Sequence, residues 1–287
     1  MIPVFIHAFH NLALALQKEL SFYGMHFIVK NHARDLGISH TAAARRPSQL
    51  FRNRFLKRKT RVSKVIKLAK ISKRCRKLFT GSVYSSATWG HQASGISDSS
   101  ILELDREALA CSGINPAGRC RTMGLIAAYG LQGTPRSRLV RETIKAWFDV
   151  IKLGGPKLIK QIRAAWPEAL KFIQNNPKSE NVVGLMTNLI LILTKAKWTP
   201  STYSAWRSPD GDTWSMTGSL VSPDIVASQV NKDLFISDFA RAEGHYNGKG
   251  IAYGIHADAT LSVLRNFKHT KLNGDKCQLE TILAAAT

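Results

Sequence analysis

Residues 52–79 read RNRFLKRKTRVSKVIKLAKISKRCRKLF, a stretch in which apolar and basic side chains follow a helical period. Between Ser48 and Thr80, positions on the apolar side recur every three or four residues, while the lysines recur out of phase with them. These apolar-side positions are Leu50, Phe55, Val62, Val65, Ala69, Ser72, Cys75 and Phe79. The spacing predicts one long amphipathic helix, or two shorter ones, with one basic face.

The same stretch carries a large excess of positive charge. From Arg45 to Lys77 there are fifteen lysines and arginines and no aspartate or glutamate. The whole chain of 287 residues has a formal net charge of +22 at pH 7. Unbalanced charge on a compact body repels itself unless an anionic partner neutralises it, so we expect nucleic acid or an anionic membrane as the partner. The alternative is a solvated helix face, but such faces usually mix both signs of charge.

Helical patterns continue through most of the chain, and the 44% hydrophobic content is enough for a sizeable core. A short strand is expected at 25–29, a buried turn between helices at 81–97, and a helix break near Pro167. The change in composition at 198–218 predicts a domain boundary near residue 198. The expected helices span residues 9–24, 98–111, 136–153, 156–176, 180–196 and 222–246, with a shorter one within 115–135 and one more after a glycine-punctuated loop within 247–267. The expected fold is therefore mainly α, with a small β element near 25–38.

The cysteines give no sign of a metal or disulfide framework. Cys75, Cys111, Cys120 and Cys277 are widely spaced and form no C-x-x-C pair, so no metal site and no cofactor are expected. A reducing, intracellular location suits such free thiols, with nucleus and cytoplasm both open. The apolar run at 182–193 is too short to span a bilayer of about 30 Å, so no transmembrane segment is expected.

Four polar residues are candidates for catalysis: Asp210, Asp212, His245 and His256. Paired carboxylates can hold a catalytic magnesium ion, and histidines can act as acids or bases. The two aspartates, however, lie in SPDGDTW, where Pro-Asp-Gly is typical of a β-turn. A structural turn is the preferred interpretation.

Other motifs also favour structural interpretations. The histidines of HAFH (7–10) lack further metal ligands, and NGKG (247–250) lacks the rest of a phosphate-binding loop. The indoles of Trp198, Trp206 and Trp214 either stack on bases or anchor a loop in the core.

Three segments in this order resemble one known family: FIVKNHARDLGI (27–38), RCRKLFTGSVYSSATWGHQASGIS (74–97) and GHYNGKGIAYGIHADATLSVLRNF (244–267). Together they are similar to the region that follows the catalytic core in reverse transcriptases of non-LTR, LINE-like retrotransposons. In that family a palm strand carries an LG element, here DLGI (35–38), and a basic helical thumb ends in a segment like GSVYSSATWGHQ (81–92). The resemblance implies a palm-end remnant at 1–40, a thumb-like region at 41–135, a helical connection at 136–197 and a loop-rich, then helical, end at 198–287.

The departures from the family decide the expected activity. Its polymerases need a Y/F-x-D-D carboxylate pair upstream of the LG strand, and this sequence contains no Asp-Asp dipeptide. We therefore expect a catalytically silent fragment of a retroelement polyprotein. Its expected partners are the backbone of an RNA, RNA–DNA or DNA duplex and the rest of a reverse transcriptase. The residues expected to contact the backbone are Arg52, Arg54, Lys57, Arg58, Arg61, Lys64, Lys67, Lys70 and Lys73.

Two other classes of function stay open from the sequence. The first is an enzyme, either a polymerase completed by a longer polyprotein or another chain, or a hydrolase that uses the four catalytic candidates. The second is a membrane-surface or protein-interaction module built on the same basic helix. No enzymatic activity is expected of the isolated chain.

Overall fold

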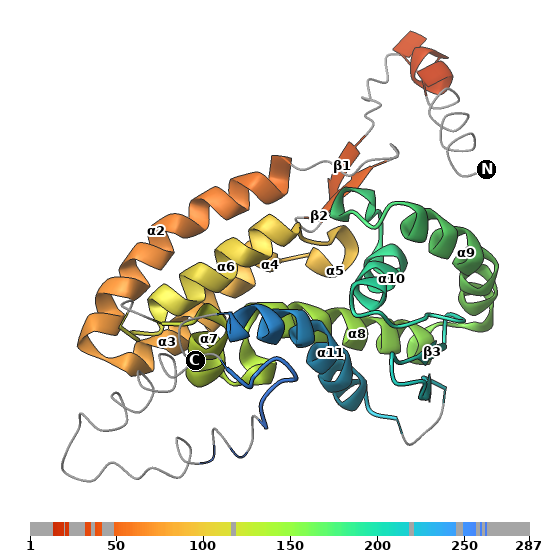
Figure 1. Ribbon diagram of the computed structural model, residues 1–287. Helices are drawn as coiled ribbons and strands as arrows, with labels where there is room; N and C mark the ends of the chain where they lie inside the picture. Colours follow the sequence, from red (N-terminus) through yellow and green to blue (C-terminus); the bar gives the residue numbers. More distant parts are fainter. Residues whose placement is uncertain are drawn as a thin grey trace.

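The computed structural model describes residues 14–19, 21–22, 32–35, 38–41, 49–115, 119–217, 221–244, 249–256, 259 and 262. These residues form a mainly helical fold, as the sequence predicts, with two small antiparallel sheets (Figure 1). The sheet of strands β1 and β2 lies near the expected β element, whereas that of β3 and β4 was not expected. The longer helices are α2 (Gln49–Ile71), α6 (Asp98–Cys111), α7 (Arg121–Tyr129), α8 (Pro135–Leu153), α9 (Pro156–Asn175), α10 (Leu185–Lys195) and α11 (Pro223–Glu243). The strands are β1 (His32–Asp35), β2 (Ile38–Thr41), β3 (Ala205–Arg207) and β4 (Thr213–Ser215).

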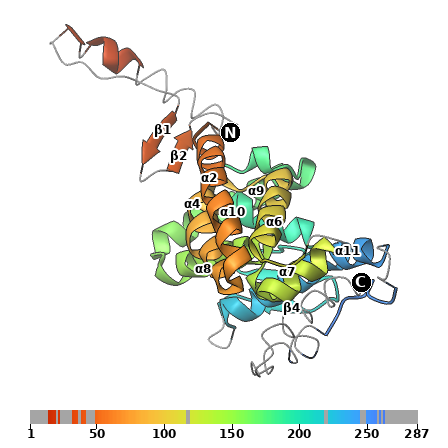
Figure 2. The same ribbon diagram turned by 90° about the vertical axis from the view of Figure 1, so that its left-hand side faces the viewer.

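The predicted basic helix forms as α2 and lies along one side of the helical bundle, across α4 (Ser85–Thr88) and α6 (Figures 1 and 2). Its apolar positions pack into a first core with α6, α7 and the start of α8. The main members of this core are Phe55, Val62, Val65, Phe79, Val83, Leu104, Ala108, Leu125 and Leu139. Burial of one helical stripe leaves the opposite stripe of α2 in solvent.

A second core joins α8, α9, α10, β3 and α11. Trp198 and Trp206 are 3% and 0% exposed and belong to this core together with Trp147 and Trp166, so the anchor interpretation of these two tryptophans is confirmed. Trp147 and Trp166 donate their indole N–H groups to Tyr203 O and Pro200 O. The residues on the two sides of position 198 thus share one core, and the expected boundary there does not separate two hydrophobic interiors.

The segment 81–97 differs from the expected turn, because most of it is helical. A π-helical segment, η2 (Phe79–Tyr84), runs into α4, and α5 (His91–Ser94) follows after a corner. The corner residue Gly90 has φ +76°, a left-handed conformation that favours glycine. Small residues permit these short helical turns to pack tightly, which a search for helical periodicity over longer windows misses.

Helix α9 also differs from expectation, because it continues through Pro167. Ile162, Trp166, Ala169 and Ile173 lie on its buried face, so packing compensates for the hydrogen bond that proline cannot donate. The expected strand at 25–29 lies outside the described residues; the observed hairpin begins at β1 instead. Among the described residues, no helix combines the length and apolar character needed to cross a bilayer.

Candidate nucleic-acid interface

The solvent side of α2 is a continuous row of cations. Residues 52 and 70 are eighteen positions apart, about 27 Å along a helix that rises 1.5 Å per residue. We call the exposed cations of this helix the α2 basic face: Arg52, Lys57, Lys59, Arg61, Lys64, Lys67 and Lys70. Since Phe55, Val62, Val65 and Ala69 hold the opposite side in the core, the orientation of this face is fixed.

Little negative charge lies near this face. Lys59 Nζ is 3.9 Å from Glu103 Oε1 at the edge that faces α6. Within the part of the chain that the structure describes, Arg52, Lys57, Lys64, Lys67 and Lys70 form no ion pair. These cations are thus available to an external anion.

Two arginines at one edge of the face also hold the neighbouring helical turns. Arg54, which is half-buried, donates from Nη1 to Trp89 O at 2.8 Å. Arg61, which is exposed, donates from Nη1 to Ser82 O at 3.4 Å. These contacts hold the two guanidinium groups against the neighbouring helical turns.

Arg58 does not lie on the α2 basic face, although the sequence placed it there. Its side chain is 0% exposed; Nε donates to Glu107 Oε2 at 2.7 Å, and Nη2 lies 3.0 Å from Glu103 Oε1 without hydrogen-bond geometry. A buried, paired arginine has no route to a phosphate. We therefore leave Arg58 out of the interface and assign it to the contact between α2 and α6.

The remaining expected residue is Lys73, which lies in the short 3₁₀ turn η1 (Lys73–Cys75), with its side chain outside the described residues. Lys59, Arg74 and Lys77 are exposed on the same segment and were absent from the expected set. Lys59, Arg74 and Lys77 all belong to the positively charged stretch from Arg45 to Lys77. A helical wheel centred on the buried residues Phe55, Val62 and Val65 is needed to tell which cations of that stretch face the solvent and which face the core.

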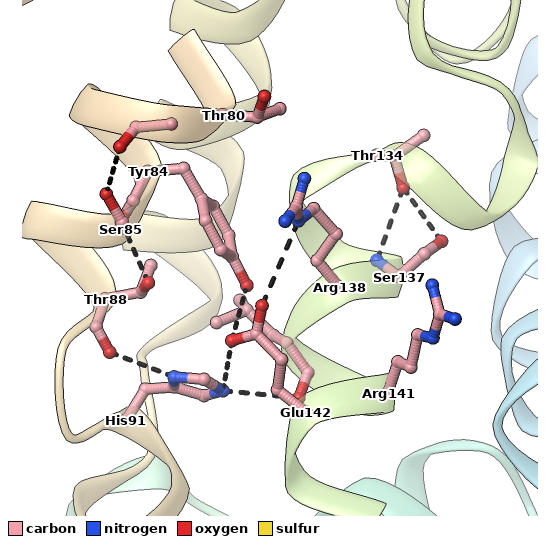
Figure 3. Close-up of polar contacts among 12 residues, drawn as sticks. Thr80, Tyr84, Ser85, Thr88, His91, Thr134, Ser137, Arg138, Arg141 and Glu142 are labelled. Carbon is pink, nitrogen blue, oxygen red and sulfur yellow. Dashed lines mark hydrogen bonds and ion pairs between the residues drawn. The ribbon is translucent and has the colours of Figure 1, made fainter. Parts of the chain in front are cut away.

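Behind this surface a polar cluster fastens the 79–94 segment to α8 (Figure 3). Tyr84 donates its hydroxyl to Glu142 Oε2 at 3.2 Å, and His91 Nε2 lies 3.7 Å from the same oxygen. His91 Nδ1 lies 2.9 Å from Thr88 O, and Nε2 lies 3.3 Å from Leu139 O, so each ring nitrogen faces a backbone carbonyl oxygen. Arg138 lies over the Tyr84 ring, 5.1 Å from its centroid.

Burial suppresses ionisation in this cluster. It lowers the pKa of His91 to about 4, although hydrogen bonds to Thr88 and Leu139 act in the opposite direction. Burial also raises the pKa of Tyr84 well above its usual range, and that of Glu142 above its ordinary value. His91 is only 3% exposed, so its ring has no access to a substrate proton. The cluster acts as a structural joint between elements.

Two of the catalytic candidates, Asp210 and Asp212, lie in and directly after a turn. Gly211 N donates to Ser208 O at 3.0 Å, which closes a β-turn over Pro209 and Asp210 and confirms the turn interpretation. Asp210, Asp212 and His256 are exposed, whereas His245 lies outside the described residues. Nowhere among the described residues do three histidine, cysteine, aspartate or glutamate side chains gather to hold a metal ion.

Comparison with protein-family models, curated proteins and solved structures finds no match for the chain. The likeness to non-LTR reverse transcriptases therefore stays a prediction from residues 27–38, 74–97 and 244–267.

Proposed function

We propose that this chain binds the phosphate backbone of a nucleic-acid duplex through the α2 basic face. The observation that carries the proposal is the row of exposed cations from Arg52 to Lys70, five of which form no ion pair within the described residues. A phosphate that meets such a cation releases condensed counterions, and this release is the main source of backbone affinity.

The spacing of the cations suits a regular polyanion. Lysine or arginine recurs every three residues at Arg61, Lys64, Lys67 and Lys70, about 4.5 Å apart along the axis. A straight helix of this kind follows a backbone without reading base edges, so we expect little sequence specificity. This is the behaviour of a polymerase-thumb-like module that holds a template–primer duplex of RNA, RNA–DNA or DNA.

The membrane alternative requires the apolar side of a basic helix to enter the lipid. In α2 that side is already in the protein core, where Phe55, Val62, Val65 and Ala69 are each at most 7% exposed. Duplex binding leaves this core intact, and insertion into a bilayer does not. We therefore favour nucleic acid over a lipid surface.

The binding experiment is a titration of a fluorescent duplex with the purified chain at several salt concentrations. We expect the affinity to fall steeply and linearly on a log–log plot, with a slope of about −0.9 for each phosphate contacted on B-form DNA. A flat plot contradicts the proposal. Co-sedimentation with anionic vesicles, with and without competing RNA, tests the membrane alternative, which requires vesicle binding that RNA does not displace.

The enzymatic alternatives have their own assay. With magnesium and a primed template, the purified chain is expected to incorporate no nucleotide, and with a labelled duplex to cleave no strand. Turnover in either assay, lost on Asp210→Asn or His256→Gln, replaces the binding proposal with an enzymatic one.

A further inference from the structure

Asp105 is a buried acid, and one of its carboxyl oxygens meets no hydrogen-bond donor among the described residues. This residue lies in α6 and is only 6% exposed. The oxygen without a donor is Oδ1. Because a buried polar atom without a partner costs free energy, nearly all such atoms in proteins are paired, either with the chain itself or with bound water.

The arginines around Asp105 do not supply the missing donor. Arg136 Nη1 donates instead to Asp238 Oδ2 at 2.7 Å, and Arg241 Nη2 also pairs with Asp238. Arg121 lines the same cavity as Asp105 but forms no ion pair in the described part of the chain. The positive charge of these arginines therefore acts on Asp105 without a hydrogen bond to its Oδ1.

A small, mainly polar cavity lies beside the Asp105 carboxyl group, where α6, α7, α8 and α11 meet. Its volume is about 10 Å³. Two of its lining residues, Leu125 and Phe235, are apolar. The polar lining residues are Asp105, Arg121, Thr122, Thr134, Arg136 and Asp238. One water molecule needs a space of about 10–15 Å³ and two to four polar partners, and this cavity meets both conditions.

We propose that this cavity is a binding site for one water molecule, which donates a hydrogen bond to the Asp105 carboxyl group. A cation is repelled by the arginines of the lining, and an anion by its two aspartates. Water is neutral, donates to a carboxylate and accepts from a guanidinium group, so it suits both kinds of neighbour. A larger ligand does not fit the volume.

The bound water molecule joins α6 to the three other helices of the cavity. The same helix carries Glu103 and Glu107, which pair with Arg58 of α2. The site therefore supports the helix against which α2 packs, from the side opposite to solvent.

The direct test is a crystal structure of the full chain at neutral pH, at a resolution that shows ordered water. We expect one peak of electron density in the cavity, at a hydrogen-bond distance of about 2.5–3.0 Å from an Asp105 oxygen. A cavity without such a peak, or a guanidinium group of Arg121 or Arg136 in direct contact with the Asp105 carboxyl group, overturns the inference.

Magnetic relaxation dispersion of solvent water counts long-lived internal water molecules and tests the site in solution. Asp105→Leu fills the cavity with an apolar side chain and is expected to lose one such molecule relative to the wild type. Asp105→Asn keeps the size and a hydrogen-bonding group and is expected to retain it. Asp149→Leu, at an exposed position of α8, is the matched control and is expected to leave the count unchanged. An equal count in Asp105→Leu and the wild type overturns the inference; if Asp105→Leu does not fold, the crystal structure decides.

Discussion

Lys57 and Arg58 are adjacent cations with opposite environments. Lys57 is exposed on the α2 basic face, whereas Arg58 continues the core-facing series Phe55, Val62 and Val65 at helical spacing. The position of Arg58 in that series was visible in the sequence. Charge alone suggested solvent, but the pairing with acids on α6 that makes its burial tolerable is a tertiary contact that the sequence does not reveal.

Removing one partner of this buried pair is expected to destabilise the fold. Arg58→Ala leaves Glu107, whose side chain is 15% exposed, without its guanidinium, and we expect a loss of about 3–5 kcal/mol in the free energy of unfolding. Lys57→Ala, an exposed neighbour, is expected to change it by less than about 0.5 kcal/mol. Urea unfolding followed by circular dichroism measures both. Similar stabilities for the two variants contradict the assignment of Arg58 to the core.

Two buried residues have shifted pKa values with opposite effects on stability. Burial lowers the pKa of His91 from 6.5 to about 4, so this residue contributes stability that is lost as the pH falls through that interval. Burial raises the pKa of Asp105 from 3.8 to about 6, although Arg136 acts in the opposite direction. Asp105 contributes stability at low pH that is lost as the pH rises from 3.8 to 6.

The two contributions oppose each other between about pH 4 and 6, and each is about 3 kcal/mol. Relative to the wild type, Asp105→Asn is therefore expected to lose stability more steeply as the pH falls. His91→Gln is expected to lose it more steeply as the pH rises through the same interval. Denaturant unfolding at several pH values measures the slopes. Slopes parallel to that of the wild type in both variants contradict these shifts.

Among the elements, the amphipathic helices were predictable, because their apolar residues recur at the helical period and so form one face that can be buried. This holds for α2 and α8. Elements that owe their form to tertiary contacts were not predictable. The β3–β4 hairpin is an example, since its strands are three residues each and Trp206 is fixed by the second core.

Helix α9 shows packing that overrides local preference at Pro167. This residue is exposed within the helix, so its main local effect is the absent backbone N–H. Pro167→Ala is expected to stabilise the protein by about 2 kcal/mol, after allowance for the greater freedom of the unfolded chain. Pro156→Ala, at the start of the same helix, is the control and is expected to give little gain. Thermal unfolding measures both, and a lower melting temperature for Pro167→Ala contradicts this account.

At the scale of the whole molecule, the two cores meet at α8. Leu139 belongs to the first core, while Val140, Ile144 and Trp147 belong to the second. The change in composition at 198 suggested a new unit, yet it marks a turn-rich segment that closes an existing core. Composition reports local character, whereas the sharing of a core depends on which faces meet in space.

The net charge of +22 attracts polyanions to any part of the surface, so the central claim concerns where that charge acts. The α2 basic face and the exposed side of α9 offer a comparison, because both present free lysines. A charge-removing triple in each helix takes away the same number of cations. The variants are Lys57→Gln, Lys64→Gln and Lys67→Gln on α2, and Lys157→Gln, Lys160→Gln and Lys171→Gln on α9, all at exposed positions.

The decisive measurement is the salt dependence of duplex-DNA affinity for the wild type and these two triples, followed by fluorescence anisotropy. We expect the α2 triple to reduce the magnitude of the log–log slope by about 2–3, since each lost phosphate contact removes about 0.9. The α9 triple is expected to keep a slope close to that of the wild type. Equal reductions in both triples, or an unchanged slope in the α2 triple, contradict the claim that α2 holds the nucleic-acid backbone.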